Sequence, residues 1–352
     1  MKILEVISST FTDINIISAI TSTISLILLG YFCRSKGIFN DQVGKILSKV
    51  VLTVGLPALA FNSFMQGIDQ QSLKDGINIL IWGLVIYIIL IFFSKPLYLK
   101  FKGDQQDTLR VLTIFGSTTF FGIPIVGAIY GAEGILYASI FNIGYRIFLY
   151  SYAYIKMSGM KMEMKNIKEM FLNPIVIATF AGLFIWIFQN YLPQVFVTKS
   201  DGTLIQVALF RIDQTAVWIY KPLTYLAGIA SPLAWLSIGA TLGSVDLKTA
   251  LTDRVSLIYC LNKVIAVPAI NLVLLLVLSF VGVMQLSTAF LGTVIIMMAT
   301  PTATVAAAYA ISFDKDAVLA SNASLLSTLA AVVLIPIWIV VINALSQIGI
   351  FG

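Results

Sequence analysis

Long apolar stretches alternate with short polar loops along the whole chain. A membrane-spanning helix needs about 20 mostly apolar residues, and the hydrophobic pattern predicts ten such spans. The second and fourth contain the most polar residues. The pattern therefore predicts an all-α polytopic membrane protein. The predicted spans are Asn15–Cys33, Val43–Met65, Gly76–Leu97, Leu109–Tyr130, Glu133–Tyr154, Pro174–Tyr191, Val217–Leu242, Val255–Val281, Leu286–Ile311 and Val318–Ala344.

Two of these spans contain a proline among glycine and hydroxyl residues. Proline removes a backbone donor and clashes with the preceding helical turn, so we expect helices four and nine to break at Pro124 and Pro301. Lipid tolerates a broken helix only where protein or water surrounds the freed backbone groups. One proline alone would more often only kink a packed helix. A matched pair of interrupted segments instead indicates a transporter binding site.

Several features recur at nearly one spacing. Pro57 and Pro232 lie 175 residues apart, and Pro124 and Pro301 lie 177 residues apart. The halves then hold five spans each, and because five is odd the second half must be inserted upside down relative to the first. We predict two inverted five-helix repeats with crossing helices four and nine. The first repeat covers residues 1–155, the second covers 173–352, and a basic cytoplasmic linker covers 156–172.

Two segments outside the spans allow two interpretations each. The linker at 156–172 is basic and rich in methionine, so it is either a short interfacial helix or an ordinary cytoplasmic loop. The outer segment Thr198–Asp213 is either an amphipathic helix on the membrane surface or a mobile outer loop.

The basic residues predict the orientation in the membrane. Thirteen Lys and Arg lie in loops on one side and five lie on the other, and the more basic side is cytoplasmic by the positive-inside rule. Both termini are then extracellular, and we expect a multi-pass protein of the plasma membrane. The N-terminus lacks a basic region that leads into an apolar core, so we expect no cleaved signal peptide.

Composition excludes several classes of protein. Hydrophobic residues make up 59% of the chain and charged residues 11%, whereas a soluble domain has about 25% charged residues. The chain has no histidine, and its two cysteines lie in predicted spans, so we expect no cofactor, metal site or disulfide framework. A net charge of +6 fits basic loops rather than a nucleic-acid partner. An enzyme is disfavoured because few groups are available for catalysis.

The candidate site combines the two breaks with cations inside the membrane. Two half-helix N-termini, each with about +0.5 charge, would face one another and would suit a small anion such as a carboxylate. Arg146 lies well inside the fifth span, where a buried charge is a functional hypothesis. Lys263 can equally extend to the cytoplasmic interface. The predicted substrate-binding residues are Ser117, Thr118, Thr119, Gly122, Pro124, Asn142, Arg146, Lys263, Thr300, Pro301, Thr302 and Asn322.

Carboxylates are missing from the interior of the predicted spans. None of the sixteen Asp and Glu residues lies deep in a span, although proton relays and many sodium sites use such groups. Basic side chains in the spans without carboxylate partners favour an anionic substrate that is not coupled to sodium. Sodium coupling through a site of backbone and hydroxyl oxygens is the alternative. In the last span, Ser321, Ser324 and Thr328 share one helix face, which serves either close packing or, with Asn322, the site.

Six short motifs, in order, resemble the auxin efflux carrier family, which includes bacterial malate and malonate permeases and plant PIN-type auxin carriers. One departure is Ser117, because many members have asparagine seven residues before the first crossover proline. Lys263 matches a lysine often found in the family's eighth span. The motifs are GLPALAF from Gly55, FGIP from Phe121, NP from Asn173, SIGATL from Ser237, ATPTA from Ala299, and SLLST from Ser324 with Pro336.

The resemblance implies a secondary transporter of small organic anions, carboxylates such as malate, that works by an elevator-like alternating-access mechanism. Spans one, two, six and seven would form a scaffold, and the other spans a transport unit that contains both broken helices. The implied partners are a small organic anion, the lipid bilayer and a second copy in a homodimer. A sodium-coupled organic-anion symporter of the bile-acid type and a transporter-like sensor are the alternative interpretations.

Overall fold

Almost all of the described chain is helical. The computed structural model describes residues 14–40, 42–159, 168, 171–198, 202–243 and 252–350. The chain is therefore a largely helical multi-pass membrane protein, as its hydropathy predicts. Among the described residues, six helices are long and apolar enough to cross a membrane, and they cover Val43–Ser63, Gln70–Leu97, Thr118–Ser158, Val217–Leu242, Arg254–Phe280 and Ala317–Gln347. Shorter apolar helices cover Ile20–Ser35, Pro174–Phe188 and Thr288–Met298.

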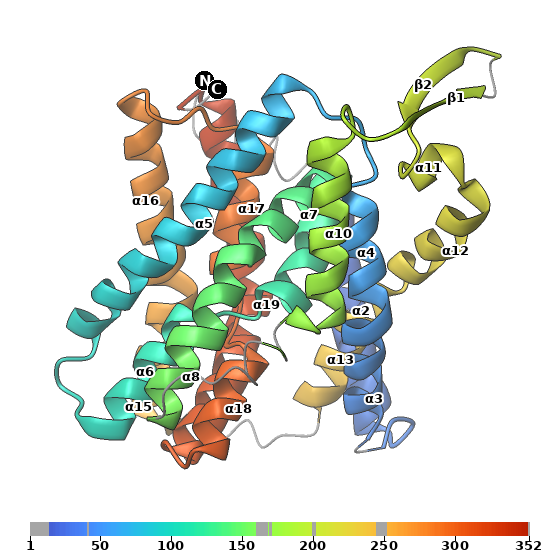
Figure 1. Cartoon of the computed structure of the whole chain (residues 1–352). Helices are drawn as coiled ribbons and strands as arrows, with labels where there is room; N and C mark the ends of the chain where they lie inside the picture. Colours follow the sequence, from blue (N-terminus) through green and yellow to red (C-terminus); the bar gives the residue numbers. More distant parts are fainter. Residues whose placement is uncertain are drawn as a thin grey trace.

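The first of two groups of helices contains segments from both halves of the sequence (Figure 1). Helices α2 and α13 pack most extensively against one another, and α4 packs against both α10 and α12. The group consists of α2 (Ile14–Ser35), α3 (Val43–Val50), η1 (Val51–Gly55), α4 (Leu56–Ser63), α10 (Pro174–Phe188), α12 (Val217–Gly228) and α13 (Ala230–Leu242).

Glycine allows the backbones of α2 and α13 to touch. A Cβ atom at Gly239 would lie 1.9 Å from the carbonyl oxygen of Ile27, and one at Gly30 would lie 2.2 Å from that of Leu236. Small residues promote such close approach in membranes, where helix association depends on packing rather than on the hydrophobic effect.

The second group contains the remaining long helices. Helix α5 packs on α7, α17 packs on α7 and α19, and α15 packs on α19. The group consists of α5 (Gln70–Leu97), α6 (Gly103–Ile114), η2 (Thr118–Gly122), α7 (Ile123–Phe148), η3 (Leu149–Ala153), α8 (Tyr154–Ser158), α15 (Arg254–Leu261), η4 (Asn262–Ala266), α16 (Val267–Phe280), α17 (Thr288–Met298), α18 (Thr304–Ser312) and α19 (Ala317–Gln347).

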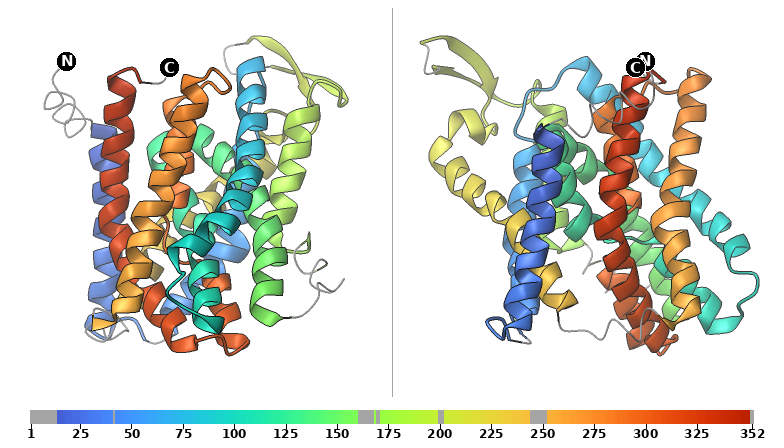
Figure 2. Two further views of the ribbon diagram at one scale, coloured as in Figure 1. Left: turned by 90° about the vertical axis from the view of Figure 1, so that its left-hand side faces the viewer. Right: turned by 180° about the vertical axis from the view of Figure 1, so that it is seen from behind.

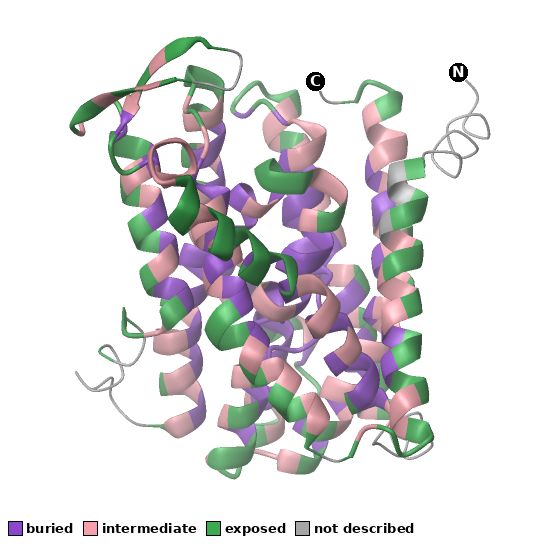
Figure 3. Ribbon diagram, turned by 90° about the vertical axis from the view of Figure 1, so that its right-hand side faces the viewer, coloured by how far each residue is buried: buried purple, intermediate pink, exposed green. Residues whose placement is uncertain are grey.

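The outer surface of the bundle is apolar. Figure 3 shows buried residues in the interior and exposed residues along the outer helix faces. Large hydrophobic side chains remain exposed, for example Phe280 (93%), Phe92 (74%) and Trp218 (74%). Exposed apolar patches of this extent mark surfaces that contact lipid or another protein, which agrees with a membrane location.

Helix α2 begins and α19 ends at the same end of the bundle (Figure 2). The start of α3 and the junction between α18 and α19 lie at the opposite end (Figure 1). At that opposite end, Lys156 pairs with Asp107 at 2.9 Å, and Lys315 pairs with Asp104. The linker at 156–172, for which a helix and a loop were both left open, falls mostly outside the described residues.

Two helices are broken where they cross. Helix α6 ends at Ile114 and η2 begins at Thr118, while α17 ends at Met298 and α18 begins at Thr304. The extended segments between them pair antiparallel, with Gly116 opposite Thr302. Ser117 N donates to Pro301 O at 2.7 Å, and Ala303 N donates to Phe115 O at 3.0 Å. These bonds satisfy backbone groups that would otherwise be unpaired inside the bundle.

The expected break at Pro301 is confirmed, but the expected break at Pro124 is wrong. The interruption lies at Phe115–Ser117, and Pro124 is in the first turn of α7, directly after η2. The widened π-helical turn explains the difference. Ile123 N donates to Thr118 O, five residues back, so the chain has already left the four-residue bonding pattern that proline disrupts.

The outer segment in the second half contains strands rather than the predicted helix or loop. Strand β1 (Gln194–Thr198) pairs antiparallel with β2 (Leu204–Ala208). Val195 and Val197 face Val207 and Ile205 across this ladder, and such β-branched cross-strand pairs stabilise a hairpin. The prediction overlooked this alternation because the segment was expected to begin only at Thr198.

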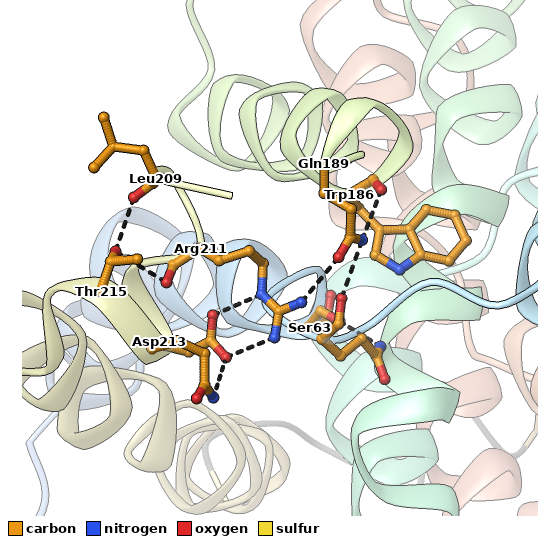
Figure 4. Close-up of polar contacts among 9 residues, drawn as sticks. Ser63, Trp186, Gln189, Leu209, Arg211, Asp213 and Thr215 are labelled. Atoms are coloured by element: carbon orange, nitrogen blue, oxygen red, sulfur yellow. Dashed lines mark hydrogen bonds and ion pairs between the residues drawn. The ribbon is translucent and has the colours of Figure 1, made fainter. Parts of the chain in front are cut away.

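A buried ion pair fastens this hairpin to the first helix group (Figure 4). Arg211 binds both carboxylate oxygens of Asp213, at 2.7 and 2.8 Å, and donates to Gln189 Oε1 at 3.0 Å. Gln189 Nε2 in turn donates to the backbone oxygen of Trp186 at 2.9 Å. The short helix α11 (Ile212–Thr215) is thereby tied to the end of α10.

Candidate functional site

Two adjoining cavities lie between the helix groups, beside the crossing. Their volumes are about 260 and about 500 Å³, and they share Ser48, Leu52, Ser117 and Phe120 among their lining residues. The larger cavity also reaches Gly44, in the first turn of α3. The joint space therefore extends from the crossing toward the end of the bundle where α3 begins (Figure 1).

Arg146 is the buried cation of this space. It lies near the C-terminal end of α7, is 7% exposed, and lines the smaller cavity with Tyr145 and Tyr150. Within the described ranges, no carboxylate pairs with its guanidinium, and no hydrogen bond ties it to the protein. A buried charge without a partner is costly, so the geometry favours an anion in the cavity.

Two helix N-termini border the same cavity. Ser117, Thr119, Ala303 and Thr304 all line it, and they lie where η2 and α18 begin. Neither Ser117 nor Ala303 caps its helix with a side-chain hydrogen bond. The first backbone N–H groups of these helices therefore remain available as donors, and their dipoles add positive potential. Ser117 and Thr119 are thus brought to the cavity as predicted.

Thr118 and Asn142 lie together behind the cavity wall. Thr118 Oγ1 donates to Asn142 Oδ1 at 2.7 Å, and both residues are fully buried. This bond joins η2 to the second half of α7. Among the described residues, Asn142 Nδ2 has no hydrogen-bond partner. The pair therefore positions the N-terminus of η2 and leaves one amide donor unused.

Lys263, Thr300 and Gly122 lie on the other face of the crossing. Lys263 is fully buried, and its Nζ donates to Thr113 O at 3.0 Å. Thr300 Oγ1 donates to Met297 O at 2.7 Å. A Cβ atom at Gly122 would lie 2.6 Å from Met297 Sδ, so this position allows close packing. None of the three is among the residues that line the two cavities.

Helix α19 reaches the crossing through Ser327 rather than Asn322. Pro301 and Thr302 line the larger cavity, and Thr302 N and Oγ1 lie 3.2 and 3.0 Å from Ser327 Oγ. Tyr259 OH lies 2.5 Å from Thr302 Oγ1 and donates to Leu112 O at 3.1 Å. Asn322 is half-buried and does not line these cavities.

The sequence interpretation missed several lining residues. The cavities include Thr53 and Tyr150, which lie in the π-helical turns η1 and η3, and such turns often occur at functional sites. Lys45 and Lys49 line the larger cavity. Their spacing of four residues, which places them on one helix face, is the signal that was available in the sequence.

One carboxylate is more buried than expected. Helix α5 begins at Gln70 rather than Gly76, and Asp75 is therefore inside it and only 4% exposed. Its two oxygens accept from Gln71 Nε2 at 2.9 Å and from Tyr137 OH at 3.3 Å. Asp75 lies in the second turn of the helix and lines neither of the two cavities beside the crossing.

Comparisons with known proteins agree with these features. The model of a family described as membrane transport protein matches residues 15–339. An uncharacterized transporter of Methanothermobacter thermautotrophicus is 26% identical over 333 residues, covering 92% of this chain and 97% of the relative. One of Methanocaldococcus jannaschii is 23% identical over 63% of this chain and 68% of the relative. One of Escherichia coli is 30% identical over 31% of this chain and 35% of the relative.

Proposed function

The chain belongs to the membrane transport protein family, that of the auxin efflux carriers, and on this premise we propose that it carries small organic anions across the membrane. Carboxylates such as malate are the proposed substrates. The transport is secondary, runs without sodium, and alternates access by an elevator-like movement.

The observation that carries this proposal is the buried guanidinium of Arg146 in a cavity bordered by two helix N-termini. The two oxygens of a substrate carboxylate would accept from the guanidinium in the bidentate manner that arginine favours. The other donors are the first N–H groups of η2 and α18 and the hydroxyls of Ser117 and Thr119. Thr118 and Asn142 support this site from behind.

Ten helices in two inverted five-helix repeats form the proposed architecture, with residues 1–155 and 173–352 as the repeats and 156–172 as the linker. The two halves of the chain meet at two places, which supports this proposal. Gly116 pairs with Thr302 at the crossing. A Cβ atom at Gly55 would lie 3.1 Å from Ala230 Cα, and these two residues each precede Pro57 and Pro232 by two positions.

The first helix group is the proposed scaffold, and the second is the proposed transport unit. The cavities lie between the groups, which supports movement of one past the other. The scaffold would also form a homodimer. The basic end of the bundle is proposed to be cytoplasmic, with both termini outside the plasma membrane, and the cavity would then be open to the cytoplasm.

The experiment is a current measurement on a solid-supported membrane with purified protein in liposomes. Malate, malonate, lactate, citrate and indole acetate are applied with and without sodium. We expect a sodium-independent current for at least one carboxylate. Arg146→Met, which keeps most of the side-chain bulk, should lower this current by at least about tenfold, since a charged hydrogen bond contributes roughly 1.5–3 kcal/mol.

The matched control is Lys74→Met, which removes an exposed cation that donates to Gln285 Oε1. Its current should equal that of the original protein. Currents that are equal in Arg146→Met and Lys74→Met would refute the proposed site. Binding of a carboxylate without any current would favour the sensor, and a strict sodium requirement would favour the symporter.

A further inference from the structure

The crossing has a second, fully buried basic group that the cavity does not explain. Lys263 has no exposed surface, and its Nζ donates to Thr113 O at 3.0 Å. Within the described ranges, no carboxylate forms an ion pair with it. A charge on this amine would therefore have to be balanced by something other than an acidic side chain.

The C-terminal ends of two half-helices supply that balance. Thr113 lies in the last turn of α6, and Thr300 follows the last residues of α17. A Cβ atom at Gly116 would lie 2.9 Å from Lys263 Nζ, 2.3 Å from Thr300 Oγ1 and 3.2 Å from Thr300 O. The amine thus binds a carbonyl in the last turn of α6 and lies on the side of Gly116 that also faces Thr300, just beyond the end of α17. Each helix C-terminus contributes about −0.5 charge there.

The local helix geometry directs Lys263 to this place. Residues Asn262–Ala266 form the π-helical turn η4 between α15 and α16. Such a turn inserts an additional residue into a helix and rotates the following side chains. Gly116 leaves the space between the two helix ends, and a side chain there would collide with Lys263 and Thr300.

The two faces of the crossing therefore have opposite polarity. The cavity face has two helix N-termini and Arg146, and the opposite face has two helix C-termini and Lys263. We propose that the opposite face is a binding site for a small monovalent cation that the protein fills permanently with its own ammonium group. The ligands of this site are carbonyl and hydroxyl oxygens of the crossing segments.

This inference gives a physical reason for sodium independence, a consequence that rests on the proposed transport function. With Lys263 in place, the helix ends need no inorganic cation. Without it, the negative C-terminal ends of the two half-helices would face one another without a cation between them. The carbonyl and hydroxyl oxygens of this site are ligands that hard cations prefer.

The test compares thermal unfolding of the purified full chain in sodium, choline, methylammonium and tetramethylammonium chloride. Lys263→Ala in choline should unfold at a temperature lower by about 5 °C or more. Sodium or methylammonium should restore at least half of this loss, whereas tetramethylammonium, which is larger and has no N–H donor, should not. The unaltered protein and Lys74→Ala should respond equally to all four salts.

Lys263→Met and Lys263→Arg separate charge from packing, and they decide the question if Lys263→Ala does not fold. Methionine fills the space without a charge, so this variant should lose stability and should not be rescued by any cation. Arginine keeps the charge, so this variant should stay closer to the original protein. A methionine variant as stable as the original, or an alanine variant that no cation stabilises, would overturn the inference.

These measurements need no substrate, so they are independent of the anion-transport result. If no anion gives a current, the proposed function fails while the cation site is still tested by unfolding. If currents are found, those of Lys263→Ala should depend on sodium or methylammonium. A sodium requirement in the unaltered protein would contradict the filled site directly.

Discussion

Gly116 is the position at which the crossing is most sensitive to one added methyl group. In Gly116→Ala, the new Cβ would lie 2.3 Å from Thr300 Oγ1 and 2.9 Å from Lys263 Nζ. Thr300 would have to leave its bond to Met297 O, and Lys263 would be displaced from Thr113 O. Overpacking costs about 1–3 kcal/mol, and the lost bonds add about 1–3 kcal/mol.

We therefore expect Gly116→Ala to lower the free energy of unfolding by about 2–6 kcal/mol and to abolish anion currents. The assay is thermal unfolding of the purified protein in detergent, followed by currents from the fraction that remains folded. Gly228→Ala is the matched control, because a Cβ atom there meets no atom within 4 Å. It should be neutral or slightly stabilising, since alanine favours helices.

The outcome that would refute this reasoning is equal stability of Gly116→Ala and Gly228→Ala. The two broken helices would then have to be further apart than the structure shows. Unaltered stability with lost currents would instead mean that the methyl group hinders movement without disturbing the packing. The expected loss of unfolding free energy would then be wrong.

Three further substitutions test other parts of the fold. Asp213→Asn should lower the free energy of unfolding by about 3–5 kcal/mol, since it leaves Arg211 buried without its carboxylate, and hydrogen exchange should rise in the hairpin; unchanged exchange there would contradict this. Gly239→Ala should cost at least about 3 kcal/mol in thermal unfolding, because its Cβ would lie 1.9 Å from the backbone oxygen of Ile27; a shift no larger than that of Gly228→Ala would contradict it. Tyr259→Phe should cost about 1–3 kcal/mol, since its hydroxyl bonds to both broken helices; a stability equal to that of the original protein would exclude this role.

Hydropathy alone determined that the chain is helical and membrane-embedded. Apolar stretches of the required length must form helices in lipid, because no water is present to bond free backbone groups. Arg146 was identified in the same way, since an isolated cation inside an apolar span is costly unless it has a function. The break at Pro301 also follows from local chemistry, because proline lacks the donor that a helix needs.

Only the tertiary structure decided where the first helix breaks and which residues share a face of the crossing. The interruption at Phe115–Ser117 depends on two backbone hydrogen bonds to a segment about 186 residues away, which no local pattern contains. The same is true of Lys263, which contacts Thr113 rather than the cavity. Its place depends on a π-helical turn and on the space that Gly116 leaves. Sequence spacing predicts which side chains share one face of a helix. The polarity of a site between crossing helices depends instead on which helix termini meet there.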